Sequence, residues 1–217
     1  MAMLGALLAG WLLICSLSST TLAARLLKSA NVPEGLTNGC ATALAADVAN
    51  CSPAIAQFQR GTYYGKTELQ TLCTAGCASS LAAYHGAVLS ACAADTWTGL
   101  GSGREPVGMI SELIRYNYNL TCLADGARFC NNAAAAFAAH LDPEAAAQPG
   151  GMPAGGDYGP PVLDPCDACL VALLRFQAGS PYYNGLDLQS ASAYQSKTAS
   201  CGITGAPLTT TTLSIFQ

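Results

Sequence analysis

The clearest pattern in the sequence is an apolar stripe between Thr67 and Cys92. Apolar or sulfur-containing residues recur there every three or four positions, which places them on one face of a helix. The stripe consists of Leu69, Cys73, Cys77, Leu81, Tyr84, Val88 and Cys92. Because three of these residues are cysteines, the pattern predicts a central helix to which other segments are joined by disulfides.

Similar patterns predict helices on both sides of this central one. Residues 40–50 are strongly helix-forming, and Ser52-Pro53 is typical of the cap and first position of a second helix. Further helices are expected at 105–118, 127–141, 164–174 and 186–200. Since no alternating pattern of useful length predicts a strand, the expected fold class is all-α, a disulfide-rich helical bundle of about six helices.

The N-terminus predicts export. An apolar run over residues 3–17 is followed by polar and then small residues, which is the layout of a signal peptide. We therefore expect residues 1–23 to be a signal peptide, with cleavage after Ala23 or Ala24. A membrane anchor is the alternative, but the run is shorter than the roughly 20 apolar residues that a bilayer span needs. The expected location is extracellular or in the cell wall, with no membrane segment after signal removal.

Cysteine usage agrees with export. Removal of the signal peptide takes away Cys15 and leaves an even number of cysteines, which predicts five disulfides. The remaining cysteines are Cys40, Cys51, Cys73, Cys77, Cys92, Cys122, Cys130, Cys166, Cys169 and Cys201. The pairing is open, but Cys73 and Cys77 share one helix face and are expected to reach different segments. Their natural partners are Cys40 and Cys51, and Cys92 is expected to join Cys122 or Cys130.

Composition limits both the core and the partners. Charged residues make up only 10% of the chain and the formal charge is -4, with both signs scattered, so nothing indicates binding to nucleic acid or to an anionic membrane. Alanine and glycine bury little area, and disulfides worth roughly 2–4 kcal/mol each are expected to supplement a modest core. We expect one cysteine-rich helical domain at 24–202, with a flexible Gly/Pro-rich loop at 142–165, followed by a Thr-rich tail or truncated linker at 203–217.

Candidate catalytic chemistry is sparse. His85 and His140 are the only histidines, and both fall at the edges of alanine-rich helices, where a partly exposed position is expected. The Cys-x-x-Cys pair at 166–169 lacks the strand context of a redox site, and the pair at 73–77 lacks the spacings of a zinc site, so structural disulfides are favoured over both. We predict no catalytic residue, metal or cofactor, and hence no enzyme. A small secreted hydrolase that uses one of the histidines is the alternative.

Two kinds of surface residue are candidate sites. Asn119 and Asn50 both begin N-glycosylation acceptor tripeptides, and Asn119 is preferred because Cys51, beside Asn50, is expected in a disulfide. Aromatic side chains in predicted turns are candidates to contact sugar rings or proteins, although packing against the ends of the bundle is the favoured alternative. These aromatic residues are Tyr63, Tyr64, Trp97, Tyr182 and Tyr183.

The order of the short motifs resembles a known family. An Arg-Gly-x-Tyr-Tyr-Gly turn is followed by a Leu-Cys-x-x-x-Cys helix, a Tyr-Asn-x-x-Cys element, a Cys-x-x-Cys-Leu helix and a Ser-Pro-Tyr turn. These motifs lie at 60–65, 72–84, 118–122, 166–173 and 180–182. Together they resemble the cysteine-rich N-terminal region of secreted fungal LysM-domain proteins, and the match covers about Cys40 to Cys201.

The resemblance implies a function at the cell surface. In such proteins a Thr/Pro-rich spacer follows this region, and LysM modules with a Gly-Asp-Thr-Cys type motif then bind chitin-like N-acetylglucosamine polymers. That motif is absent here, so the family's sugar-contacting residues have no counterparts in this sequence. We expect the sequence to be either a truncated LysM protein or a free-standing N-terminal module. We expect a secreted, non-enzymatic interaction protein whose partner is a cell-wall polysaccharide or an extracellular protein. A purely structural, protease-resistant spacer is the alternative.

Overall fold

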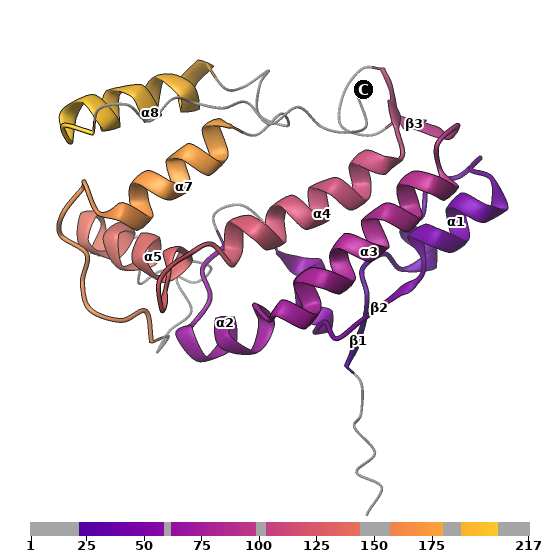
Figure 1. Ribbon diagram of the computed structural model, residues 1–217, viewed down its shortest axis with the longest axis horizontal. Helices are drawn as coiled ribbons and strands as arrows, with labels where there is room; N and C mark the ends of the chain where they lie inside the picture. The colour runs from indigo at the N-terminus through magenta and orange to yellow at the C-terminus, as the bar shows by residue number, and fades with distance from the viewer. Residues whose placement is uncertain (1–21, 59–61, 99–102, 144–156, 180–187, 204–217) are drawn as a thin grey trace, which may run out of the picture.

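The computed structural model describes residues 22–58, 62–98, 103–143, 157–179 and 188–203. Two long helices, α3 and α4, run side by side through the middle of the molecule (Figure 1). The first elements of the chain lie at one end of this pair, and α5, α7 and α8 lie at the other. The described residues form seven α-helices and three two-stranded antiparallel ribbons. The predicted disulfide-rich helical fold is therefore confirmed in part, but the all-α class is wrong.

The predicted central helix is two helices. α2 (Lys66–Leu72) and α3 (Ala75–Ala91) meet at a bend of 51°. Thr74 causes the break, because its side chain accepts a hydrogen bond from the backbone N–H of Cys77 at 3.1 Å and so caps a new helix. The apolar stripe still lies in the core on both sides of the bend, with Leu69 and Leu81 essentially inaccessible.

The first predicted helix ends early. α1 covers Asn38–Leu44, and β2 (Asp47–Ala49) then pairs antiparallel with β1 (Ala23–Arg25), so the helix expected at 40–50 is wrong beyond Leu44. Ala24 is fully buried opposite Val48, and the expected domain start at residue 24 thus falls inside β1. β1 and β2 escaped prediction because three residues are too few to show an alternating pattern.

The remaining elements follow the expected order with shifted bounds. Ser52 caps a short helix as predicted, but this is a 3-10 helix, η2. Glu105 and Pro106, expected to start a helix, instead belong to a strand that pairs with the segment around Trp97. The elements are η1 (Ser29–Asn31), η2 (Pro53–Gln57), β3 (Thr96–Thr98), β4 (Arg104–Pro106), α4 (Gly108–Thr121), β5 (Ala124–Asp125), β6 (Arg128–Phe129), α5 (Cys130–Leu141), α7 (Ala168–Ala178) and α8 (Leu188–Ser200).

Two hydrophobic cores lie along the long axis. The larger one surrounds α3 and collects buried residues from β1 to α4. Within it the Tyr84 hydroxyl donates to the carbonyl of Leu44 at 2.9 Å, which joins α3 to the end of α1, and burial raises the pKa of Tyr84 to about 12. The smaller core contains mainly short side chains between α5 and α7. Short side chains bury little area, so covalent links matter most in this second core.

The structure pairs all ten cysteines expected in the mature chain. Cys73 and Cys77 do bond to different segments, and Cys77 joins Cys51, one of the two upstream partners expected. The expectation that Cys73 also bonds to Cys40 or Cys51 is wrong, because the packing of α4 beside α3 brings Cys122 to Cys73. The expected link from Cys92 to Cys122 or Cys130 is wrong, because α1 packs along α3 and brings Cys40 to its far end. The bonds are Cys40–Cys92, Cys51–Cys77, Cys73–Cys122, Cys130–Cys169 and Cys166–Cys201.

None of the helices in the described residues is by itself both long and apolar enough to cross a membrane. The bent pair α2 and α3 passes that test when its two helices are joined, on length and composition alone.

Candidate functional site

A cleft of about 560 Å³ lies among the described residues near the junction of the two cores. It lies between the first residue of α2, the β5–β6 hairpin, the first turn of α5 and the segment 157–164 that precedes α7. We call it the Arg128 cleft. Its walls are formed by Lys66, Asp125, Ala127, Arg128, Phe129, Asn132, Ala133, Tyr158, Gly159, Pro160, Pro161, Val162, Leu163, Asp164 and Asp167.

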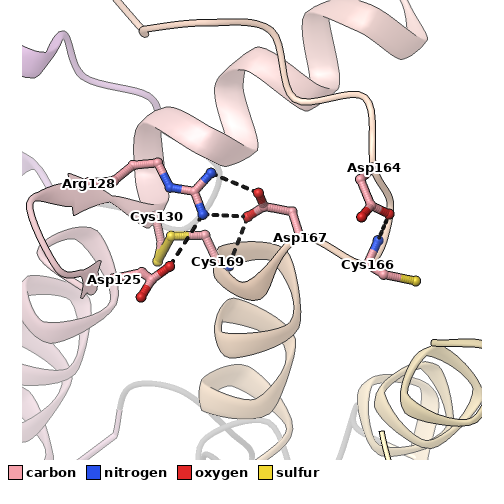
Figure 2. Close-up of polar contacts among 7 residues, drawn as sticks. All are labelled: Asp125, Arg128, Cys130, Asp164, Cys166, Asp167 and Cys169. Atoms are coloured by element: carbon pink, nitrogen blue, oxygen red, sulfur yellow. Dashed lines mark hydrogen bonds and ion pairs between the residues drawn. A yellow bond between two sulfur atoms is a disulfide. The ribbon is translucent and has the colours of Figure 1, made fainter. Parts of the chain in front are cut away.

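Arg128 is held by two carboxylates (Figure 2). Its guanidinium donates to both oxygens of Asp167, at 2.7 and 2.9 Å, and more weakly to Asp125 at 3.4 Å. Asp167 also accepts the backbone N–H of Cys169 at 2.9 Å and thereby caps α7. Burial alone would raise the pKa of Asp167, but the hydrogen bonds from Arg128 and from the helix backbone outweigh it and hold this pKa below its ordinary value.

A disulfide lies directly against this ion pair. Cys130 and Cys169, the first residue of α5 and the second of α7, are bonded beside Arg128 in Figure 2. A few residues earlier, Asp164 accepts the backbone N–H of Cys166 at 2.8 Å, as expected for a carboxylate before this helix. The wall of the cleft is therefore fixed by one covalent and several charged contacts, so the cleft is largely preformed.

The cleft is equipped for binding. Asp125, Asp164 and Asp167 all take part in hydrogen bonds that hold the wall together. Lys66 is exposed at one edge, and its backbone N–H donates to the carbonyl of Asp157 at 2.9 Å, next to the half-buried Tyr158. A cation beside an aromatic ring and apolar walls can recognise a ligand that has both polar edges and an apolar face.

His85 lies in a buried polar network, so the expected exposed position is wrong. Its ring is 4% exposed and its two nitrogens contact Ser111 Oγ and Glu112 Oε2, each at 2.9 Å. Ser111 donates to the carbonyl of Gly108, and Glu112 also pairs with Arg115 at 3.2 Å. Burial raises the pKa of Glu112, but its hydrogen bond with His85 and the charge of Arg115 hold it below its ordinary value.

This network has the residue types of a hydrolase triad but not its access. Ser111 is 1% exposed, and neither Ser111 nor His85 lines any of the three grooves described here. A substrate could not reach the hydroxyl without separation of α3 from α4. We therefore interpret these residues as a polar link between the two helices. His140 is exposed near the end of α5, as expected.

The three predicted aromatic contact residues that the structure describes do not form one surface. Tyr64 is buried, its backbone N–H donates to Asn131 Oδ1 at 2.9 Å, and its ring packs on Phe58 at 4.8 Å between centroids. Tyr63 is half-buried beside it. The favoured alternative, packing against the core, describes Tyr64. Tyr182 and Tyr183 lie outside the described residues.

Among the predicted aromatic contact residues that the structure describes, Trp97 lines an open groove. The groove, also about 560 Å³, lies between the segment 30–34 and the β3–β4 hairpin, and includes Pro33, Glu34 and Arg104. We call it the Trp97 groove. The indole is half-buried and packs partly against the larger core, with its N–H inside and without a hydrogen-bond partner. It therefore offers part of a ring and no indole donor to a ligand.

The two glycosylation candidates are both exposed. Asn119 lies in the last turn of α4, and Asn50 follows β2 with a positive φ of 58°. Both positions stay predictions for modification.

Sequence reasoning missed the centre of the Arg128 cleft. Asp167 caps α7 and Asp164 accepts a backbone N–H in the turn before it, but Arg128 lies 39 residues before Asp167 and nothing in the sequence links them. In the part of the chain that the structure covers, no three His, Cys, Asp or Glu side chains gather as a metal site would require.

Comparison with known proteins gives the family. A family model described as the N-terminal domain of secreted LysM effectors matches residues 23–136, more than half of the chain. The chain belongs to this family of secreted fungal proteins. The match includes the larger core and three sides of the Arg128 cleft, whereas the segment 157–164 and α7 lie beyond it.

Two relatives extend the comparison. The secreted LysM effector Vd5LysM of Verticillium dahliae is 35% identical over 185 residues, which is 84% of this chain and 26% of the relative. A LysM domain-containing protein of Arthroderma benhamiae is 37% identical over 112 residues, or 52% of this chain and 20% of that protein. This effector domain thus spans about a quarter or less of each relative. No solved structure matches it significantly.

Proposed function

We propose that this secreted LysM effector domain is a non-enzymatic binding module whose Arg128 cleft takes a segment of cell-wall polysaccharide. The observation that carries the proposal is the composition of the cleft, which combines an exposed cation, aromatic rings and apolar walls. Sugar rings present polar hydroxyl edges and apolar faces, so Tyr158 and Phe129 suit the faces while Lys66 suits the edges.

The fixed carboxylates favour binding over catalysis. Glycoside hydrolysis needs one carboxyl group free to donate a proton and a second free to act as base or nucleophile. Asp125 and Asp167 instead pair with Arg128, and Asp164 caps the turn before α7. The low pKa of Asp167 also suits an ion pair and not a proton donor at neutral pH.

Capture on insoluble polysaccharides tests this proposal. The secreted domain is incubated with chitin, cell-wall β-glucan or cellulose particles, and bound protein is quantified after washing. We expect retention on at least one polymer and a loss of at least about fivefold, equal to about 1 kcal/mol, in Lys66→Ala and Tyr158→Leu. Trp97→Ala, which changes a separate groove, is the matched control and should bind normally. A wild-type domain that no polymer retains would refute the proposal.

The disulfide pattern supports a second candidate, a protease-resistant spacer. Each described α-helix contains, or ends within two residues of, a cysteine bonded to another element. Such cross-linking restricts the local unfolding that proteases need. A spacer should resist proteases until reduced, bind no polymer and give no specific partner when culture fluid is cross-linked. One specific cross-linked partner would exclude a purely structural role.

A further inference from the structure

We propose that Asn119 carries an N-linked glycan whose first sugars lie in the groove beside it and cover the Cys73–Cys122 disulfide. The groove, of about 510 Å³, lies between the start of α3, the end of α4, the β5–β6 hairpin and α7. We call it the Asn119 groove. The inference is independent of the Arg128 cleft, which lies on other residues except for the shared Phe129.

The Asn119 groove has a mainly apolar wall, which includes Ala78, Leu123, Phe129 and Phe176. A small apolar wall of this kind can pack against one face of a sugar ring. Both half-exposed cysteines of the Cys73–Cys122 bond also lie in this wall.

Asn119 is placed to supply the cover. It is exposed, it starts the acceptor tripeptide Asn119-Leu120-Thr121, and it is itself part of the groove wall. The neighbouring Tyr118 is buried and its hydroxyl donates to the carbonyl of Thr74 at 3.0 Å, which fixes the end of α4 against the start of α3. A sugar attached at Asn119 therefore starts from a rigid position at the groove.

N-acetylglucosamine, the first sugar of such a glycan, matches the groove in chemistry. Its ring has an apolar face and its acetyl group ends in a methyl, and both can pack on Phe129 or Phe176. The hydroxyl edges remain in water at the open side. Because the sugar is tethered, packing needs little further loss of translational freedom, and even weak contacts suffice to hold it.

The burial of Thr121, the third residue of the acceptor tripeptide, determines when the glycan can be attached. Thr121 is 3% exposed, so its hydroxyl is hidden once α4 has packed. Transfer must therefore precede folding: a bond forms between Asn119 Nδ2 and C1 of a polyprenyl-diphosphate-linked oligosaccharide, the C1–O bond to the diphosphate breaks, the amide nitrogen loses a proton, and the lipid diphosphate leaves. The Cys73–Cys122 bond then closes beneath an attached glycan.

Asn50 provides a contrast within the same chain. Its side-chain amide donates to Ser80 Oγ at 3.4 Å, and it precedes the cysteine of the buried Cys51–Cys77 bond. Asn50 lies at none of the three grooves described above, so Asn50→Gln is the matched control.

The experiment uses the full chain secreted from a eukaryotic host. Intact mass is measured before and after peptide-N-glycosidase treatment of wild type, Asn119→Gln and Asn50→Gln. Wild type and Asn50→Gln are expected to carry a glycan that Asn119→Gln lacks. An unmodified Asn119 would overturn the proposal.

A second measurement tests whether the glycan covers the groove. The glycan is removed enzymatically from folded wild type, which avoids any folding defect of the variant, and a small thiol then reduces the exposed disulfides. Mass spectrometry should show that the Cys73–Cys122 disulfide is reduced roughly three- to tenfold faster after deglycosylation, because the thiol then reaches the bond without obstruction by the sugars. The rate for Cys166–Cys201, away from the groove, should not change. Equal rates for Cys73–Cys122 with and without the glycan would show that the sugars extend into solvent, and would overturn the proposal.

Discussion

The buried contact between His85 and Glu112 allows a quantitative test of how α3 is held to α4. Substitution of Glu112 by Gln keeps the size of the side chain but removes its charge. The side chain of Glu112 is 13% exposed and that of His85 5%, so their 2.9 Å contact is a buried charge-assisted hydrogen bond, worth roughly 1.5–3 kcal/mol. Arg115 is 36% exposed, and its contact with Glu112 adds well under about 1 kcal/mol after solvent screening.

Glutamine can still accept one neutral hydrogen bond from His85. We therefore expect Glu112→Gln to lower the free energy of unfolding by about 2 kcal/mol near pH 6. For a chain of this size that corresponds to a fall in melting temperature of about 4–8 °C. Thermal or chemical unfolding, followed by circular dichroism with the disulfides intact, measures the difference.

The same contact predicts how the difference in stability between wild type and Glu112→Gln changes with pH. The pKa of Glu112 is lower in the folded chain than in the unfolded one, so the unfolded chain binds more protons in the interval between the two values. The contribution of Glu112 is therefore fully present above its unfolded pKa, about 4.3, and is lost as the pH falls through the lower folded pKa. The stabilities of wild type and Glu112→Gln should converge in acid. Equal stability at pH 6, or a difference that persists unchanged below the folded pKa, would refute the reasoning.

Three further changes test other parts of the fold. Asp167→Asn keeps the cap of α7 but removes the charge that faces Arg128, and should cost about 1 kcal/mol because Arg128 is 40% exposed; thermal unfolding checks this. Replacement of Cys73 and Cys122 together by Ala opens a link between residues 49 apart and should lower unfolding free energy by about 4 kcal/mol in urea titration. Gly126→Ala, at φ 61° in the β5–β6 turn, should cost about 1 kcal/mol in the same titration. No measurable change in any one of these would contradict the corresponding contact.

Periodicity predicted the helical parts of the fold well. Apart from the half-exposed Cys73 at the bend, the stripe from Leu69 to Val88 is buried as its spacing indicates, because burial of one face is a local property of a helix. The bend within it was missed, since Thr74 sits between two runs that share the same period and its capping role depends on geometry. The short ribbons were missed for a different reason, because two or three residues are too few to show alternation.

Long-range contacts were beyond the sequence. The pairing of Cys40 with Cys92 depends on how α1 lies along α3, and that of Cys73 with Cys122 depends on the packing of α3 and α4. The same limit hid the Arg128 cleft, which is assembled from segments that span about a hundred residues of sequence. His85 was misplaced because its alanine-rich neighbours suggested an exposed edge, whereas Glu112 on the next helix supplies the partner that allows its burial.

The central claim is that the Arg128 cleft holds a segment of polysaccharide. Amide hydrogen exchange of the full secreted chain, with and without soluble oligosaccharides from the polymer that retains it, tests this most directly. We predict slower exchange at 125–133 and 157–164, the two sides of the cleft, and no change in the β3–β4 hairpin beside Trp97. Protection confined to the Trp97 groove, or no protection at either side of the Arg128 cleft, would contradict the account.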